Sequence, residues 1–170
     1  MENEIKEIQT MAEKMLGLIP VLKKPKSFGR WDNYALIITD QRAIFAQITG
    51  NMVKEAAAEA QRNGKEEGKG FLSRWADQLK ATMAYSERYW NIPPNDAFNE
   101  NPGNFAIPNQ DIKQIKIKQK SQSSWGQEID QTVTEIRIES TGKKENYNID
   151  VYSQDMVNML KGIFGDRVKT

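Results

Sequence analysis

The stretch Tyr34-Ala-Leu-Ile-Ile-Thr-Asp-Gln-Arg-Ala-Ile-Phe45 decides the fold of this chain. It contains two runs of apolar, mostly β-branched or aromatic residues, which favour strands, on either side of a polar tetrapeptide, Thr39 to Arg42. Thr and Asp favour a tight turn because their side-chain oxygens accept hydrogen bonds from nearby backbone N–H groups. The stretch therefore predicts an antiparallel β-hairpin.

Both faces of these predicted strands are apolar. In the first strand, one face carries Tyr34, Leu36 and Ile38, and the other carries Ala35 and Ile37. A strand that is apolar on both faces is normally covered on both sides. We therefore expect other elements to pack on the face of the hairpin that lies away from the main core.

The residues before the hairpin predict a helix, a strand and a basic loop. Helical spacing of apolar residues predicts an amphipathic helix over 2–16, ended by Gly17. The next residues, 18–22, form a candidate strand in which Pro20 requires an edge position or a bulge. Residues 23–30 are rich in lysine and are expected to form a loop.

The residues after the hairpin predict an inserted helical hairpin at about 51–90. Residues 51–63 are rich in alanine, and a glycine-rich break separates them from a second helical pattern at 71–90. In that second helix we expect Phe71, Trp75 or Leu79 to cover the outer face of the strands. Residues 91–106 are rich in asparagine and proline and are expected to form an irregular loop.

The last third of the chain predicts three strands and a helix. Alternating apolar residues indicate strands at 112–119, 133–140 and 145–151, with a bulge at Ile112. Ser153 is a good N-cap for a C-terminal helix that Gly165 ends. An apolar face is expected on that helix, formed by Met156, Met159, Leu160, Ile163 and Phe164.

The hairpin pattern Tyr-x-Leu-Ile-Ile-Thr-Asp-x-Arg-x-Ile-Phe resembles the early hairpin of bacterial pleckstrin-homology-like (PH-like) and GRAM-like domains. The resemblance covers roughly residues 18–50 and 104–165. It implies an α+β fold with a PH-like antiparallel core of two packed sheets, plugged by the C-terminal helix. The N-terminal helix and the inserted helical hairpin are additions to that core.

Composition narrows the classes of function. The 170 residues include 24 basic and 23 acidic side chains, a net charge of +1, which argues against a nucleic-acid binder. No apolar run approaches the ~20 residues of a membrane-spanning helix, and the acidic N-terminus is unlike a secretory signal. We expect one domain over 1–170 that is cytoplasmic, with peripheral membrane association as an added expectation.

Catalysis and metal binding have little support in the sequence. The chain contains no histidine and no cysteine, so acid–base chemistry would need a carboxylate, lysine or tyrosine with a shifted pKa. The oxygen-rich residues of 95–101 lack the spacing of an EF-hand. We expect no enzyme activity, metal or cofactor, and an enzyme with a carboxylate-based site stays as a second alternative.

Two kinds of binding surface remain. Basic residues grip phosphoinositide headgroups in the corresponding loop of eukaryotic PH domains, and the resemblance implies an anionic-lipid site at Lys23, Lys24, Lys26 and Arg30, with Phe28 and Trp31 as anchors. Four such residues supply only about 4 kcal/mol, a millimolar affinity. We therefore favour a non-catalytic binding or scaffolding module that contacts a protein partner or itself. The candidate surface for that contact is Ile5, Ile8, Met15, Trp75, Tyr85 and Trp90.

Overall fold

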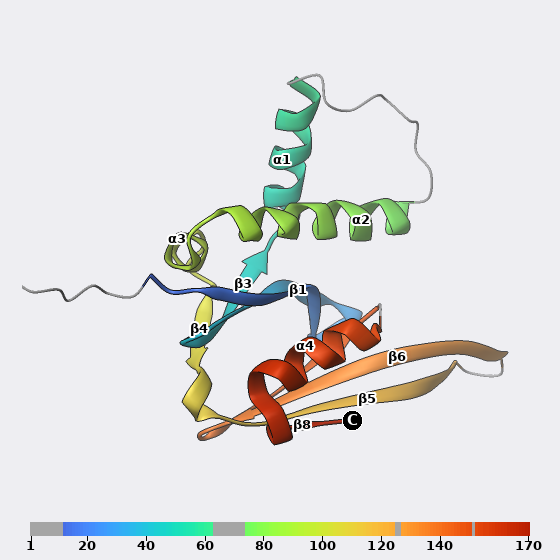
Figure 1. The fold of residues 1–170 in the computed structure, drawn as a ribbon. Coiled ribbons are helices and arrows are strands. Elements are labelled where there is room, and N and C mark those ends of the chain that lie inside the picture. Colours follow the sequence, from blue (N-terminus) through green and yellow to red (C-terminus); the bar gives the residue numbers. More distant parts are fainter. Residues whose placement is uncertain (1–11, 63–73, 125–126, 151) are drawn as a thin grey trace, which may run out of the picture.

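The computed structural model describes residues 12–62, 74–124, 127–150 and 152–170, which form an α+β fold (Figure 1). The strands are β1 (Met15–Pro25), β2 (Trp31–Thr39), β3 (Arg42–Ile48), β4 (Phe105–Pro108), β5 (Ile112–Ser124), β6 (Gln127–Ser140), β7 (Lys143–Ile149) and β8 (Val168–Lys169). The α-helices are α1 (Gly50–Arg62), α2 (Arg74–Glu87), α3 (Pro94–Asn99) and α4 (Gln154–Phe164). None of the helices in the described ranges is long and apolar enough to cross a membrane.

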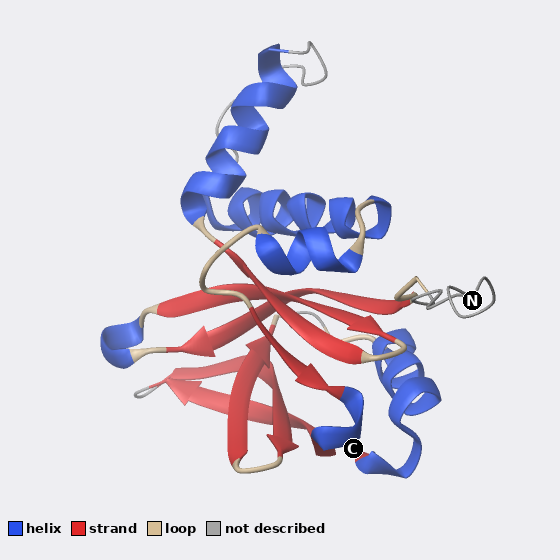
Figure 2. Cartoon of the chain, turned by 90° about the vertical axis from the view of Figure 1, so that its left-hand side faces the viewer, coloured by secondary structure: helices blue, strands red, loops and turns tan. Residues whose placement is uncertain are grey.

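The strands form one sheet in the order β4-β3-β2-β1-β7-β6-β5-β8. All neighbouring strands are antiparallel except β5 and β8, which are parallel. In the described part of the chain a single residue pair, Lys23 with Asn148, joins β1 to β7. The two halves of the sheet therefore fold over each other (Figure 2). Two separate sheets were expected, and the structure instead joins them at this one pair.

The main core lies between the two halves of the sheet and beneath α4. Its fully buried side chains include Leu22, Phe45, Ile136, Tyr147 and Leu160. The predicted C-terminal helix is confirmed, because the Ser153 hydroxyl accepts the Met156 N–H at 3.1 Å. Gly165 ends the helix with a positive φ of 58°, a backbone conformation that glycine adopts readily.

A second core covers the outer face of β1–β3, as the two-faced apolar pattern predicted. Strand residues such as Ala35, Ile37 and Ile44 are buried there against Tyr89 and Ala97. Tyr89 lies in the 3₁₀ turn that follows α2, and Ala97 lies in α3. The structure confirms that other elements cover this face, and at the centre of the cover the contacting residues are Tyr89 and Ala97. Phe71 and the side chain of Trp75 lie outside the described residues, and Leu79 lines a pocket described below.

The prediction of a helix over residues 2–16 is wrong at its C-terminal end. Residues 1–11 lie outside the described residues, but Met15 and Leu16 belong to strand β1. The turn between β2 and β3 holds the backbone that precedes them: Lys14 N–H donates to the Asp40 carboxylate and Asp40 N–H donates to Lys14 C=O, both at 2.9 Å. These bonds hold the chain beside the β2–β3 turn as it enters β1.

The expected loops are shorter than predicted. Lys23, Lys24 and Pro25 continue β1, so only the tip of the basic stretch is a turn. Residues 91–106 contain α3 and the start of β4, which pairs with the free edge of β3. Asn104 makes this possible, because its amide donates to the Ala97 and Phe98 carbonyls and accepts the Gln47 N–H.

The inserted helices are present, but they do not lie side by side as a hairpin. Helix α2 lies across the outer face of β1, whereas α1 projects away from the sheet in both views (Figures 1 and 2). Strand β8 was not predicted. Its two residues pair with Ile115 and Lys116 at the outer edge of β5.

Candidate functional site

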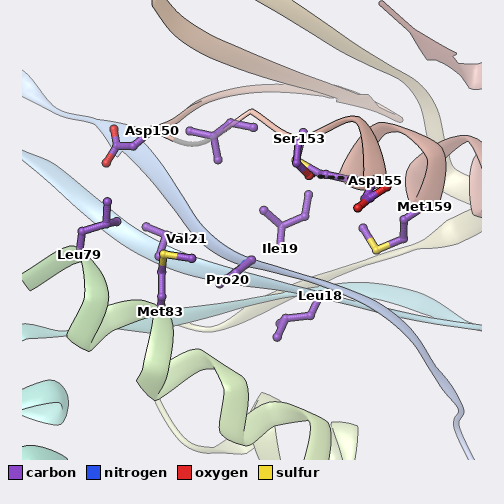
Figure 3. A pocket seen from close by; sticks show the side chains of 12 residues that line it. Leu18, Ile19, Pro20, Val21, Leu79, Met83, Asp150, Ser153, Asp155 and Met159 are labelled. Carbon is purple, nitrogen blue, oxygen red and sulfur yellow. Dashed lines mark hydrogen bonds between the residues drawn. The ribbon is translucent and has the colours of Figure 1, made fainter. Parts of the chain in front are cut away.

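A pocket of about 410 Å³ opens between α2, β1 and α4 (Figure 3). It is lined by Leu18, Ile19, Pro20, Val21, Leu79, Met83, Ile149, Asp150, Ser153, Asp155, Met156 and Met159. The volume lies in the range of pockets that hold a small ligand or an inserted side chain. The geometry of the sheet explains it: among the described residues β1 and β7 pair at Lys23 and Asn148, and none of these residues pairs as a strand with Leu18–Val21 on this side of β1.

Helix α2 forms one wall. The Ser86 hydroxyl donates to the Pro20 carbonyl at 2.6 Å, which fixes the end of α2 to β1. Pro20 lies within a register shift between β1 and β2, so the predicted bulge is confirmed. Leu79 and Met83 lie seven and three residues before Ser86, on the same face of the helix. They therefore face β1 across the pocket.

Helix α4 forms the opposite wall. Val157, Leu160 and Phe164 are buried in the main core, while Met156 and Met159 are half-buried and line the pocket. Met159 packs so closely on β1 that a Cβ added at Gly17 would lie 2.3 Å from its sulfur. A larger residue at position 17 would therefore require the Met159 side chain to move.

The charged side chains at the pocket are acidic. Among the described lining residues only Asp150 and Asp155 are charged, and Asp150 forms an ion pair with Lys23. Asp155 lies in the first turn of α4, where the helix N-terminus stabilises a carboxylate. The pocket thus combines an apolar interior with carboxylates at its edge.

The predicted lipid-binding residues lie along the β1–β2 hairpin, and three of the four are in ion pairs. Lys23 pairs with Asp150, Lys24 with Glu145 at 2.7 Å, and Lys26 with Asp32 at 2.6 Å. Burial alone would raise the pKa of Glu145, but hydrogen bonds from Lys24 and Lys143 lower it overall. Arg30 is exposed and forms no ion pair within the described part of the chain. These ion pairs offset most of the positive charge of the hairpin.

Phe28 at the tip of this hairpin is 96% exposed and has a left-handed backbone, with φ 62°. A bulky residue seldom adopts that conformation, which costs about 1–2 kcal/mol. Trp31 lies nearby at 38% exposure, with the Lys23 ammonium 5.0 Å from its ring centre. An exposed aromatic side chain held at energetic cost marks the tip as a second candidate surface.

Three of the six predicted protein-contact residues have described side chains, namely Met15, Tyr85 and Trp90. Met15 and Tyr85 pack against the second core. The Tyr85 hydroxyl accepts from Arg88 at 2.8 Å, and burial raises its pKa. Trp90 is 50% exposed. Ile5, Ile8 and the side chain of Trp75 lie outside the described residues.

The Thr39–Arg42 turn, the most conspicuous motif of the sequence, has a structural role. The buried Thr39 hydroxyl accepts the Gln41 and Arg42 N–H groups at 3.1 and 3.0 Å and contacts Glu13 at 2.7 Å. Arg42 donates two hydrogen bonds of 2.9 Å to the Glu13 carboxylate, which lowers the pKa of Glu13. We call this set of bonds the turn clamp.

Side chains of the oxygen-rich residues 95–101 hydrogen-bond to other parts of the protein. Asn95 accepts from Arg42 at 3.4 Å, and Glu100 accepts from Tyr89 at 3.0 Å and from Arg88. In the part of the chain that the structure describes, no three acidic side chains group as a metal site would require. These asparagines and carboxylates hold α3 and the turn after α2 in place.

Sequence analysis missed the pocket, because its walls come from three segments distant in the chain, 18–21, 79–83 and 149–159. Two features of the sequence could have indicated it. Leu79 and Met83 are spaced to lie on one face of a helix, and the C-terminal helix has more apolar residues than a single core contact needs. No protein-family model, curated protein or solved structure matches this chain.

Proposed function

We propose that the chain is a non-catalytic binding module of PH-like type that contacts a protein partner. The antiparallel strand order from β4 to β5, with α4 closing the space between the two halves of the sheet, supports the PH-like assignment. The helical segment between β3 and β4 is then an insertion into that core. The absence of histidine and cysteine from the sequence supports a role without catalysis.

The pocket between α2 and α4 is the observation that carries this proposal. Its apolar wall includes Met83, Met156 and Met159, and methionine side chains adapt readily to different apolar surfaces. Such a pocket suits an aliphatic or aromatic side chain of a partner segment. The 3.1 Å bond that caps α4 and the 2.6 Å bond between Ser86 and Pro20 fix the walls before a ligand arrives.

Site-specific photocrosslinking in cells tests the proposal. A photoreactive residue at Leu79 faces the pocket, while one at Ala84 lies on the exposed side of the same helix. We expect Leu79 to capture a defined protein that Ala84 does not capture. A peptide from the captured region should then compete for the crosslink. Equal products from the two positions would contradict the proposal.

Peripheral binding to anionic lipid through the β1–β2 hairpin is the second candidate, favoured by the exposed Phe28. Phe28 and Trp31 would enter the interface beside Arg30. The ion pairs of Lys23, Lys24 and Lys26 leave little free positive charge, so this affinity is expected to be low.

Co-sedimentation with vesicles of phosphatidylserine and phosphatidylcholine tests this second candidate. Binding should decrease with salt and be lost in Phe28→Ala and Arg30→Glu. The matched control is Lys113→Glu, an exposed change in β5 away from the hairpin. Binding that survives all three substitutions would remove the hairpin from consideration.

A further inference from the structure

The charge at the rim of the apolar pocket differs from the charge of the rest of the molecule. The whole chain is almost neutral, with a net charge of +1, but the charged lining residues of the pocket are both aspartates. No lysine or arginine lines the pocket among the described residues. A ligand that enters the pocket therefore meets negative charge at its edge.

The two aspartates are not equivalent. Asp150 follows β7 and is paired with Lys23, whose ammonium also lies over the Trp31 ring, so its charge is largely offset. Asp155 is exposed and forms no ion pair within the described part of the chain. It lies next to Met156, and Met159 follows one turn later on the same helix. The unneutralised carboxylate is thus beside the apolar wall.

We propose that the pocket selects partner segments in which a lysine or arginine neighbours the apolar side chain that enters it. This inference rests on the proposed function and names the chemistry of its ligand. The apolar side chain contacts Leu79, Met83 and Met159, and the cation pairs with Asp155 at the rim. An acidic neighbour, or the carboxylate of a fatty acid, meets repulsion at the same place.

The size of the selectivity follows from the exposure of Asp155. An ion pair at a solvent-exposed rim is worth about a two- to fivefold change in affinity. The apolar contact supplies most of the affinity, and the charge distinguishes between ligands. Because the attraction is screened, the preference should shrink as salt is raised.

A titration with three matched peptides tests the inference on the full chain. The probes are short blocked peptides with a central phenylalanine followed by lysine, glutamine or glutamate. The readout is the NMR signals of the methyl groups of Met83, Met156 and Met159. We expect the lysine peptide to bind about two- to fivefold tighter than the glutamine peptide, and the glutamate peptide to bind weakest.

Two substitutions assign the preference to Asp155. Asp155→Asn should make the lysine and glutamine peptides equal. The control Asp96→Asn changes an exposed first-turn aspartate of α3, outside the pocket, and should keep the preference. Equal binding of all three peptides to the wild type, or a preference that survives Asp155→Asn, overturns the inference but leaves the pocket as a binding site. Absence of methyl shifts with every peptide overturns the proposed function as well.

Discussion

The two turns that flank strand β2 use their side chains in opposite ways. At the β2–β3 turn, Thr39, Arg42 and Glu13 form the turn clamp, with bonds of 2.7–3.1 Å and a fully buried Thr39. At the β1–β2 tip, Phe28 is 96% exposed and Arg30 points into solvent without an ion pair among described residues. The polar groups of the β2–β3 turn hydrogen-bond within the protein, whereas Phe28 and Arg30 at the β1–β2 tip are exposed to solvent.

This difference separates side chains that stabilise the fold from side chains that remain available to a ligand. The polar pattern at Thr39–Arg42 is the more conspicuous in the sequence, yet its hydrogen bonds are satisfied internally, so little remains for a ligand. The tip and the α2–α4 pocket are less conspicuous, and their side chains face solvent or an empty space. Removing side chains at both turns should therefore have unequal effects on stability.

The largest difference in stability is expected when the arginine of each turn is replaced by alanine. Arg42→Ala removes two bonds to Glu13, the contact with Asn95 and the packing over the Phe98 ring, and leaves a half-buried carboxylate unpaired. We expect a loss of about 2–4 kcal/mol in the free energy of unfolding, measured by urea denaturation. Arg30→Ala should change it by less than about 0.5 kcal/mol. Equal losses would mean that Arg30 is also structural.

The hydroxyl of Thr39 should have the next largest effect. Thr39→Val keeps the shape of the side chain but leaves the Gln41 and Arg42 N–H groups without their acceptor. The expected loss is about 1–3 kcal/mol. Thr39→Ser retains the hydroxyl and should recover most of that loss. If both variants are equally destabilised, the methyl group and not the hydroxyl is responsible.

The sequence predicted elements that depend on local pattern and missed those that depend on distant contacts. The hairpin, the bulges at Pro20 and Ile112, the alanine-rich helix and the cap at Ser153 follow from neighbouring residues, and the structure confirms them. Strand β4 forms because β3 has a free edge, and β8 forms because β5 has one. Edges of this kind cannot be seen in a linear pattern.

The same reasoning applies to the candidate sites. The four basic residues of the hairpin could be named from the sequence, but Asp150 and Glu145, the partners of Lys23 and Lys24, lie more than a hundred residues away in the chain. Their ion pairs change the expected charge of that surface. The pocket needs the relative positions of α2, β1 and α4, which no local pattern contains.

A smaller and pH-dependent effect is expected at Glu13. Arg42 holds the pKa of Glu13 below its ordinary value of 4.5, so the folded state favours the carboxylate more than the unfolded state does. Its stabilising contribution is therefore present above the ordinary pKa and is lost as the pH falls through the lowered one. Glu13→Gln should cost about 1–2 kcal/mol at neutral pH.

Unfolding free energies measured from pH 7 to pH 3 check this linkage. The gap between wild type and Glu13→Gln should narrow as the solution is acidified. The control Glu59→Gln, an exposed residue of α1, should stay within about 0.5 kcal/mol of wild type throughout. A gap that does not change with pH would show that Glu13 acts through packing rather than charge.

The smallest effect should be a gain, and it is expected at the tip. Phe28 has a left-handed backbone, which asparagine adopts more readily, and its ring makes almost no contact with the protein. Phe28→Asn should therefore raise the free energy of unfolding by up to about 1 kcal/mol, seen as a higher Tm. Combined with a loss of binding to anionic vesicles or to the captured partner, that gain would mean that the chain keeps an unfavourable residue for its function. A lower Tm in Phe28→Asn would mean instead that the ring supports the hairpin, and the contrast between the two turns would disappear.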